Sequence, residues 1–202
     1  GTVEREVRDG AYDYYNSLVR ITGDRRESYR KRHLVPFGEF IPPGFGWVLN
    51  ILHIPMSDFS RGGDGQAVLT AGGVRFGVAI CYEDMFGEEV IDALPAAQVL
   101  VNVSNDAWFG HSFEAAQHLQ ASQMRALETG RPVVRATNTG VTAAIDERGR
   151  VTASLPEFTR GTLVADIVPR KGTTPYVRWG NSVVLVLTAL FAAAAIFTRA
   201  RR

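Results

Sequence analysis

Two apolar runs in the middle of the chain are each followed by polar residues, and this pattern predicts an α/β fold. The first run, VRFGVAIC (74–81), follows two glycines and precedes acids, as a buried strand of a central sheet does. The second run, AAQVLVNVSN (96–105), has the same form and ends in a polar turn. Between them, GEEVIDAL (87–94) fits a short crossover helix with an acidic first turn. Strands alternating with helices are typical of a layered fold in which reactive side chains collect at strand ends.

The segments on either side extend this pattern. The first 21 residues predict a pair of strands, and residues 131–156 predict further strands, with a hairpin turn at DERGR. Residues 114–129 predict a helix that ends at Gly130. Its buried face is expected to carry Ala115, His118, Leu119, Ser122 and Ala126. We therefore expect one α/β domain over residues 1–175.

The C-terminal segment carries an apolar run, SVVLVLTALFAAAAIF, that is long enough for one helix. Extended to residues 180–198, it reaches the short end of the about 17–25 residues that span a bilayer. A buried core helix is the alternative, but Trp179 before the run and Arg199 after it favour a membrane crossing. The basic tail, residues 199–202, predicts a cytoplasmic C-terminus and a domain on the opposite side of the membrane.

The stretch PPGFGWVLNILHIPMSDFSRGGDG (42–65) has proline and glycine at its margins and apolar residues between them. Two interpretations stay open. The stretch is either a short core helix inside a long loop or a partly exposed apolar arm that touches lipid.

Composition limits the possible functions. The chain is 46% hydrophobic and 21% charged, which suits a packed domain, and its net charge of +1 predicts no nucleic-acid partner. A single cysteine excludes an internal disulfide and a cysteine-rich zinc site. The histidines show no ligand-like spacing, so we expect neither a metal nor another cofactor. They are His33, His53, His111 and His118.

Cys81 is the first candidate for chemistry. A lone buried cysteine is commonly a small hydrophobic residue, but this one ends a predicted central strand just before a polar turn. A thiol at such a place is presented at the edge of the sheet, where a nearby cation favours the nucleophilic thiolate. The segment YRKRHLVPFGEFIP (29–42) offers a cation, Lys31, and an acid, Glu39, although its basic residues also fit a solvated surface.

The motifs together are more specific than any one of them. YRKRHLVPFGEFIP, ICYEDMFGE, NVSNDAWFG, QMRALETGRPVVRATNTGVTAAID and TPYVRWGN, with an apolar helix after them, resemble the C-terminal part of the apolipoprotein N-acyltransferase family. That family uses a carbon-nitrogen hydrolase (nitrilase-like) domain. The resemblance runs in order from about residue 12 to the last residue.

The resemblance implies an αββα sandwich with a Glu–Lys–Cys triad. Carried over by motif, Cys81 is the nucleophile and Lys31 the catalytic lysine, with Glu39, Tyr82 and Glu83 as supporting residues of the active site. Lys31 and backbone N–H groups would stabilise the developing oxyanion, and Glu39 would hold Lys31 charged and oriented. Glu83 would either assist proton movement or order the site.

The family's general-base glutamate lies on an earlier strand. Nothing upstream of Cys81 in this chain matches it, and Glu4 and Glu6 stand in the wrong context. We therefore expect the chain to be part of a longer enzyme, with a sandwich incomplete at its N-terminus and no activity alone.

Two further motifs have alternative interpretations. Asn105, Asp106 and Trp108 either line the pocket or form a turn in which the first two cap backbone groups and Trp108 packs on the core. Arg125 and Glu128 are expected to form an ion pair on a helix face rather than to act as catalytic groups.

The resemblance implies acyl transfer through a Cys81 thioester at the bacterial inner membrane, with the catalytic domain in the periplasm. The partners would be a phospholipid donor, an apolipoprotein acceptor and the membrane. Two rivals stay open: an amidase of the nitrilase type acting on small amides, and a membrane-tethered nitrilase-like domain without catalysis.

Overall fold

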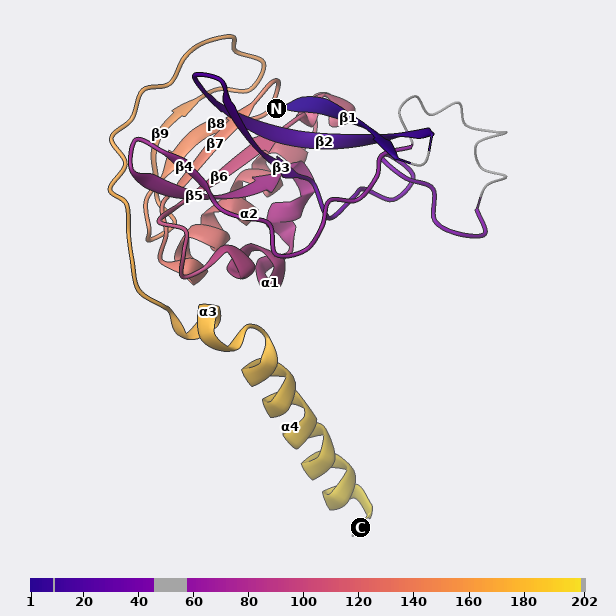
Figure 1. Ribbon diagram of the computed structural model, residues 1–202. Coiled ribbons are helices and arrows are strands. Elements are labelled where there is room, and N and C mark those ends of the chain that lie inside the picture. The colour runs from indigo at the N-terminus through magenta and orange to yellow at the C-terminus, as the bar shows by residue number, and fades with distance from the viewer. Residues whose placement is uncertain (9, 46–57, 201–202) are drawn as a thin grey trace.

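The computed structural model describes residues 1–8, 10–45 and 58–200, and it confirms an α/β fold with two sheets (Figure 1). The first sheet is antiparallel, in the order β1-β2-β3. Its strands are β1 (Thr2–Arg8), β2 (Ala11–Thr22) and β3 (Arg25–Arg30). The strand pair predicted at the start of the chain is therefore confirmed.

The second sheet is mixed and has the order β4-β5-β6-β7-β8-β9. Its strands are β4 (Leu69–Ala71), β5 (Val74–Ile80), β6 (Val99–Ser104), β7 (Val133–Thr137), β8 (Thr142–Ile145) and β9 (Val151–Leu155). Strands β5, β6 and β7 run parallel, and the other pairs are antiparallel. The carboxyl ends of β5, β6 and β7 consequently meet at one edge, where the polar residues after the two apolar runs come together.

Helices join and cover the strands. They are η2 (Cys81–Met85), α1 (Gly87–Val90), η3 (Ile91–Ala93), η4 (Asp106–Phe109), α2 (Glu114–Thr129), α3 (Pro175–Trp179) and α4 (Ser182–Ala200). The crossover predicted at 87–94 is two short helices. Helix α2 has the predicted bounds, because Gly130 takes the left-handed conformation, with φ of 62°, and ends it.

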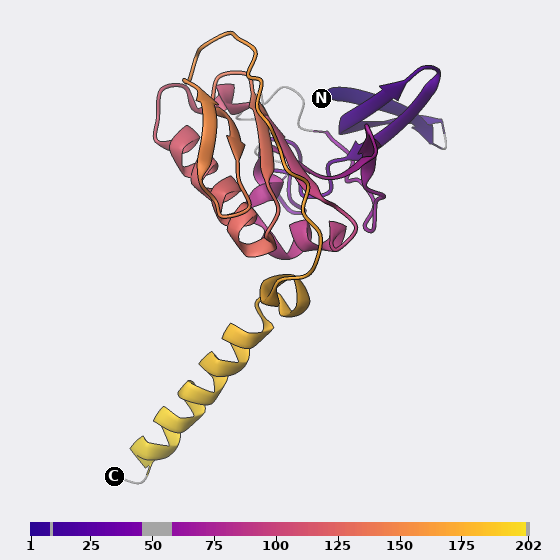
Figure 2. The same ribbon diagram turned by 90° about the vertical axis from the view of Figure 1, so that its left-hand side faces the viewer.

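The second sheet buries both faces. On one face, α1 and α2 pack on the strands through a cluster that includes Val90, Ala126 and Val133. On the other face, Tyr29 of the first sheet forms a buried cluster with Leu69 and Ile80, and Leu18 packs against this cluster. Figure 2 shows the first sheet on the side of the second that lies away from α2. The described layers are thus helix, sheet and sheet, and apolar residues fill both interfaces.

Helix α4 lies outside these layers. Its segment Ser182–Arg199 has a mean hydropathy of 2.0 and is 0% buried by the rest of the chain. Within the described chain α4 is therefore not covered as a core helix would be, and it is long and apolar enough to be a candidate membrane span. The stretch predicted to be a core helix or an apolar arm falls largely in residues 46–57, outside the described residues.

Candidate active site

Cys81 stands directly after β5 and begins η2, so the strand ends one residue earlier than predicted, at Ile80. It is a free thiol and half-buried. Its backbone has φ of 53°, a left-handed conformation that costs a residue with a side chain about 1–2 kcal/mol. A sharp strand-to-helix turn of this kind presents a side chain at the edge of a sheet, as the nucleophile of other hydrolases is presented.

Lys31 follows β3, and its side chain is fully buried. Its Nζ atom lies 2.6 Å from Oε2 of Glu39, so the predicted contact is confirmed. Glu39 is itself held, because it accepts hydrogen bonds from Nδ2 of Asn16 at 3.0 Å and from the N–H of Val35 at 2.9 Å. The ammonium therefore has a fixed partner and a fixed direction.

Glu83 connects the Lys31 segment to the Cys81 segment. Its buried carboxylate accepts hydrogen bonds from the N–H groups of Ile80 at 2.7 Å, Arg32 at 2.7 Å and His33 at 3.1 Å. The Tyr29 hydroxyl donates to the same carboxylate at 3.1 Å. Burial raises the pKa of Glu83, although the backbone N–H groups oppose the shift. The residue after Lys31 and the residue before Cys81 are thus tied to one side chain, and the role of Glu83 in proton movement or in ordering the site stays a prediction.

Tyr82 is half-buried and belongs to an aromatic group beside this connection. Its ring meets His33 edge-on at 5.7 Å and Phe86 edge-on at 5.0 Å, and His33 stacks on Phe86 at 3.6 Å between ring centroids. Nδ1 of His33 lies 2.7 Å from a Glu89 oxygen. The supporting residues predicted from the CYE motif therefore lie against the segment that follows Lys31.

The SNDAWFG motif divides between surface and interior. Asn105 accepts a hydrogen bond from the N–H of Ala107 at 3.2 Å, so the expected turn is present. Asp106 is buried, whereas Trp108 is 60% exposed, and the expectation that Trp108 packs on the core is wrong. These residues lie at the end of β6, and their role as pocket residues stays a prediction.

A buried polar network lies beneath Cys81, and no sequence motif predicted it. Its members come from η2, β6, η4, α2 and β7: Asp84, Asn102, Asp106, Glu114, His118, Ser122 and Arg135. Arg135 has no exposed side-chain surface and lies 3.0 Å from Asp106. Hydrogen bonds from His118 and Ser104 and the charge of Arg135 lower the pKa of Asp106, although burial opposes this.

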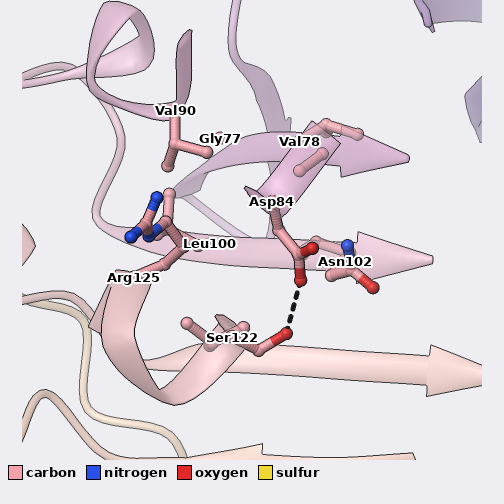
Figure 3. A pocket seen from close by; sticks show the side chains of 11 residues that line it. Gly77, Val78, Asp84, Val90, Leu100, Asn102, Ser122 and Arg125 are labelled. Atoms are coloured by element: carbon pink, nitrogen blue, oxygen red, sulfur yellow. Dashed lines mark hydrogen bonds between the residues drawn. The ribbon is translucent and has the colours of Figure 1, made fainter. Parts of the chain in front are cut away.

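A small cavity borders the network on the side of α1 and α2. Figure 3 shows the Ser122 hydroxyl donating to Asp84 across it, at 2.6 Å, with Val90 and Leu100 on the apolar wall. Arg125 also lines the cavity and pairs with Glu128 at 2.9 Å, which confirms the predicted ion pair on the helix face. Cys81 is not among the lining residues.

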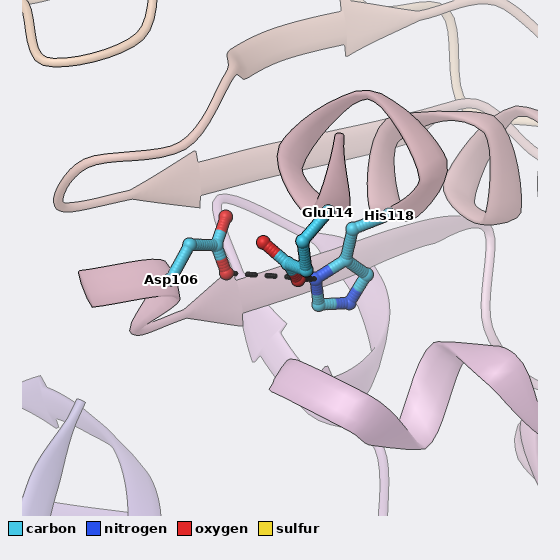
Figure 4. Close-up of side chains that lie close together, drawn as sticks. All are labelled: Asp106, Glu114 and His118. Carbon is cyan, nitrogen blue, oxygen red and sulfur yellow. Dashed lines mark hydrogen bonds and ion pairs between the residues drawn. The ribbon is translucent and has the colours of Figure 1, made fainter. Parts of the chain in front are cut away.

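His118 is the centre of the network. Its Nδ1 lies 3.1 Å from Glu114 and 3.5 Å from Asp106 (Figure 4), and its Nε2 lies 2.8 Å from Asp84. Burial opposes a charge on the imidazole, but the hydrogen bonds to Asp106 and Asp84 outweigh it and raise the pKa of His118 to about 10. The imidazole is therefore positively charged at neutral pH.

Asp106, Glu114 and His118 also offer ligand atoms within 4.8 Å of one another, the arrangement that a metal ion needs. However, both ring nitrogens of His118 face only oxygen acceptors, and the Arg135 guanidinium already neutralises Asp106. The donor set therefore favours a proton on each ring nitrogen over a metal ion.

Comparison with known proteins places the chain in a family. The model of the carbon-nitrogen hydrolase family matches residues 1–175. The chain belongs to the carbon-nitrogen hydrolase family. Among solved structures, a carbon-nitrogen hydrolase from Helicobacter pylori has the same fold, with a TM-score of 0.53 and 17% identity over 72% of this chain and 54% of that one. The glutamine-dependent NAD+ synthetase of Acinetobacter baumannii has a TM-score of 0.59 and 15% identity over 79% of this chain and 29% of that one.

Curated relatives within this carbon-nitrogen hydrolase family are more similar in sequence. The chain is 57% identical to the apolipoprotein N-acyltransferase of Nitrosomonas europaea, over 94% of the chain and 38% of that protein. It is 51% identical to that of Methylococcus capsulatus, over 87% of the chain and 35% of that protein. The chain thus spans little more than a third of the length of these relatives.

Proposed function

We propose that this chain is the catalytic region of an apolipoprotein N-acyltransferase. It would transfer an acyl chain from a phospholipid to the N-terminal amine of a lipid-modified apolipoprotein. The observation that carries the proposal is the link through Glu83, which brings the turn of Cys81 and the segment of the buried Lys31 together. The identity to enzymes of that name supports the choice of reaction.

The reaction proceeds in two steps. In the first, Sγ of Cys81 attacks the ester carbonyl of the phospholipid, a thioester forms, and the ester C–O bond breaks to release a lysophospholipid that takes up the proton. In the second, the acceptor amine attacks the thioester, an amide forms, and the C–S bond breaks to release the Cys81 sulfur, which takes up the proton that the amine loses. Lys31 and the N–H groups of η2 stabilise the oxyanion of each step, and Glu39 keeps the ammonium in place.

The supporting residues and the base complete the site. Tyr82 and Glu83 order the turn, and Asn105, Asp106 and Trp108 form one wall beside the carboxyl end of β6. The general-base glutamate comes from a strand that is not part of residues 1–202. The segment that contains this strand completes the αββα sandwich.

The domain over residues 1–175 works at the membrane. The exposed apolar surface of α4, with Trp179 at one border and Arg199 at the other, supports a crossing over residues 180–198. The basic residues 199–202 would then face the cytoplasm, and the catalytic domain the periplasm. Both substrates are lipids, which accounts for a hydrolase-like domain tied to a bilayer.

Intact-protein mass spectrometry tests the proposal. The full-length protein is incubated with phospholipid vesicles but without acceptor peptide, and a mass gain of one acyl chain that hydroxylamine removes is expected. Cys81→Ser must abolish the gain, and Lys31→Met must reduce it strongly, whereas Lys171→Met replaces an exposed lysine and should leave it unchanged. An adduct that persists in Cys81→Ser, or a folded membrane protein that forms none, contradicts the proposal and favours an amidase or a tethered binding domain.

A further inference from the structure

We propose that His118 is a positioning residue for Cys81, holding the peptide of the nucleophile in its left-handed conformation through the carbonyl oxygen. This inference rests on the proposed role of Cys81 and adds a residue that none of the motifs indicates. His118 lies on α2, far along the chain from the turn that it supports.

The contact is direct. The carbonyl oxygen of Cys81 accepts a hydrogen bond from Nε2 of His118 at 3.1 Å and another from Nδ2 of Asn102 at 3.2 Å. One donor comes from α2 and the other from β6, so the carbonyl is held from two elements. The direction of this carbonyl is set by ψ of Cys81, the rotation about its Cα–C bond. Since φ and ψ together define the left-handed conformation from which the thiol projects, holding the carbonyl helps to hold the thiol in place.

The surroundings keep His118 a donor. Its Nε2–H is shared between Cys81 and Asp84, and its Nδ1–H faces Glu114 and Asp106. All of these partners are acceptors. Arg135 is the other cation of the network, and it bonds Asn102 at 2.8 Å, which orients the amide so that its nitrogen points to Cys81.

The expected consequence follows from geometry. Without its donors the carbonyl of Cys81 is free to turn, because the left-handed conformation is unfavourable for a residue with a side chain. A displacement of the nucleophile by about 1 Å is enough to slow a reaction about a hundredfold. We therefore expect the thiol to lose reactivity while the domain stays folded.

The test compares three variants of the full-length protein in membranes. His118→Met removes both donors at similar volume, and His118→Gln keeps an N–H donor of similar reach. Ser122→Ala removes the hydrogen bonds that Ser122 makes with Asp84 and Arg135 and removes no contact of Cys81. Two rates are measured by mass spectrometry: alkylation of Cys81 by iodoacetamide, and thioester formation with phospholipid vesicles. Thermal unfolding shows that each variant is folded.

A loss of about a hundredfold in His118→Met, with most of the rate recovered in His118→Gln, supports the proposal. Three results would overturn it: unchanged rates in His118→Met, equal losses in the Met and Gln variants, or the same loss in Ser122→Ala. If His118→Met does not fold, Asn102→Asp replaces it, since an aspartate keeps the acceptor for Arg135 and lacks the donor to Cys81. Unchanged rates in Asn102→Asp also overturn the proposal.

The two readouts separate this inference from the proposed function. If the wild-type protein forms no thioester, the acyltransferase proposal fails, and the alkylation rates alone decide whether His118 positions Cys81. If the thioester forms and the variants react like wild type, only the role of His118 is refuted.

Discussion

The charge on His118 makes the stability of this domain depend on pH in a specific window. The pKa of His118 rises from an ordinary value of about 6.5 to about 10 in the folded protein. Because the folded state binds this proton more tightly than the unfolded chain, the stabilisation is complete below about pH 6.5 and is lost as the pH rises to about 10. At about 1.4 kcal/mol per pH unit, the proton contributes about 5 kcal/mol well below pH 6.5 and about 4 kcal/mol at pH 7.

The measurement isolates this proton by difference. The thermal midpoint of the wild-type protein and of His118→Gln is recorded in detergent at intervals from pH 6 to pH 10. Other groups titrate in both proteins, so their effects cancel in the difference. For a domain of this size, 1 kcal/mol corresponds to about 2–4 °C in the thermal midpoint. The midpoint of the wild type should therefore be about 10 °C or more above that of His118→Gln near pH 6.

The difference between the two thermal midpoints should decrease steadily toward pH 10, and most of the decrease should occur above pH 7. A constant difference across the range would show that His118 keeps one protonation state throughout. It would refute the argument that the carboxylates of Asp84 and Asp106 hold its second proton.

Two further predictions concern the ion pair and the network. Glu39→Gln leaves the buried ammonium of Lys31 without its counter-charge and should lower the free energy of unfolding by about 3–5 kcal/mol. Thermal or chemical denaturation measures this loss. A loss below about 1 kcal/mol would contradict the buried ion pair. Gly140→Ala places a methyl group against the carboxylate of Asp106 and should cost about 1–3 kcal/mol by the same measurement. Gly63→Ala, which meets open space, is its control, and equal midpoints for the two variants would argue against the close approach.

Local patterns were enough to predict most of the fold. The strand over Val74–Ile80 is a nearly unbroken apolar run, and the helix over Glu114–Thr129 repeats its apolar positions and ends at a glycine, so each signal lies within the element itself. The direction of Trp108 was not predictable in the same way. An aromatic residue after a strand fits a core or a surface equally, and only the placement of η4 decides that it is exposed.

The candidate site shows the same limit more sharply. Cys81, Lys31 and Glu39 carry their own signals: a single thiol at a strand end, and a cation and an acid around a rigid turn. Asp84 and Arg135 carry no such signal in the sequence. A charged residue beside a motif or within a strand is common, and only its partner in the structure shows that it belongs to a site. Glu114 and His118 do offer a signal in their i,i+4 spacing, but that spacing on a helix occurs equally often at the surface.

The burial of this network changes what the turn after β5 can do. Three carboxylates, those of Asp84, Asp106 and Glu114, share the charges of His118 and Arg135, so removing one cation leaves acids facing one another away from water. The network therefore resists rearrangement, and it holds the two donors to the carbonyl of Cys81, His118 and Asn102, in place. On the other side of the turn, Glu83 fixes the N–H of Ile80. The backbone before and after the strained residue is thus held by different sets of buried groups, and the strain at Cys81 can therefore persist.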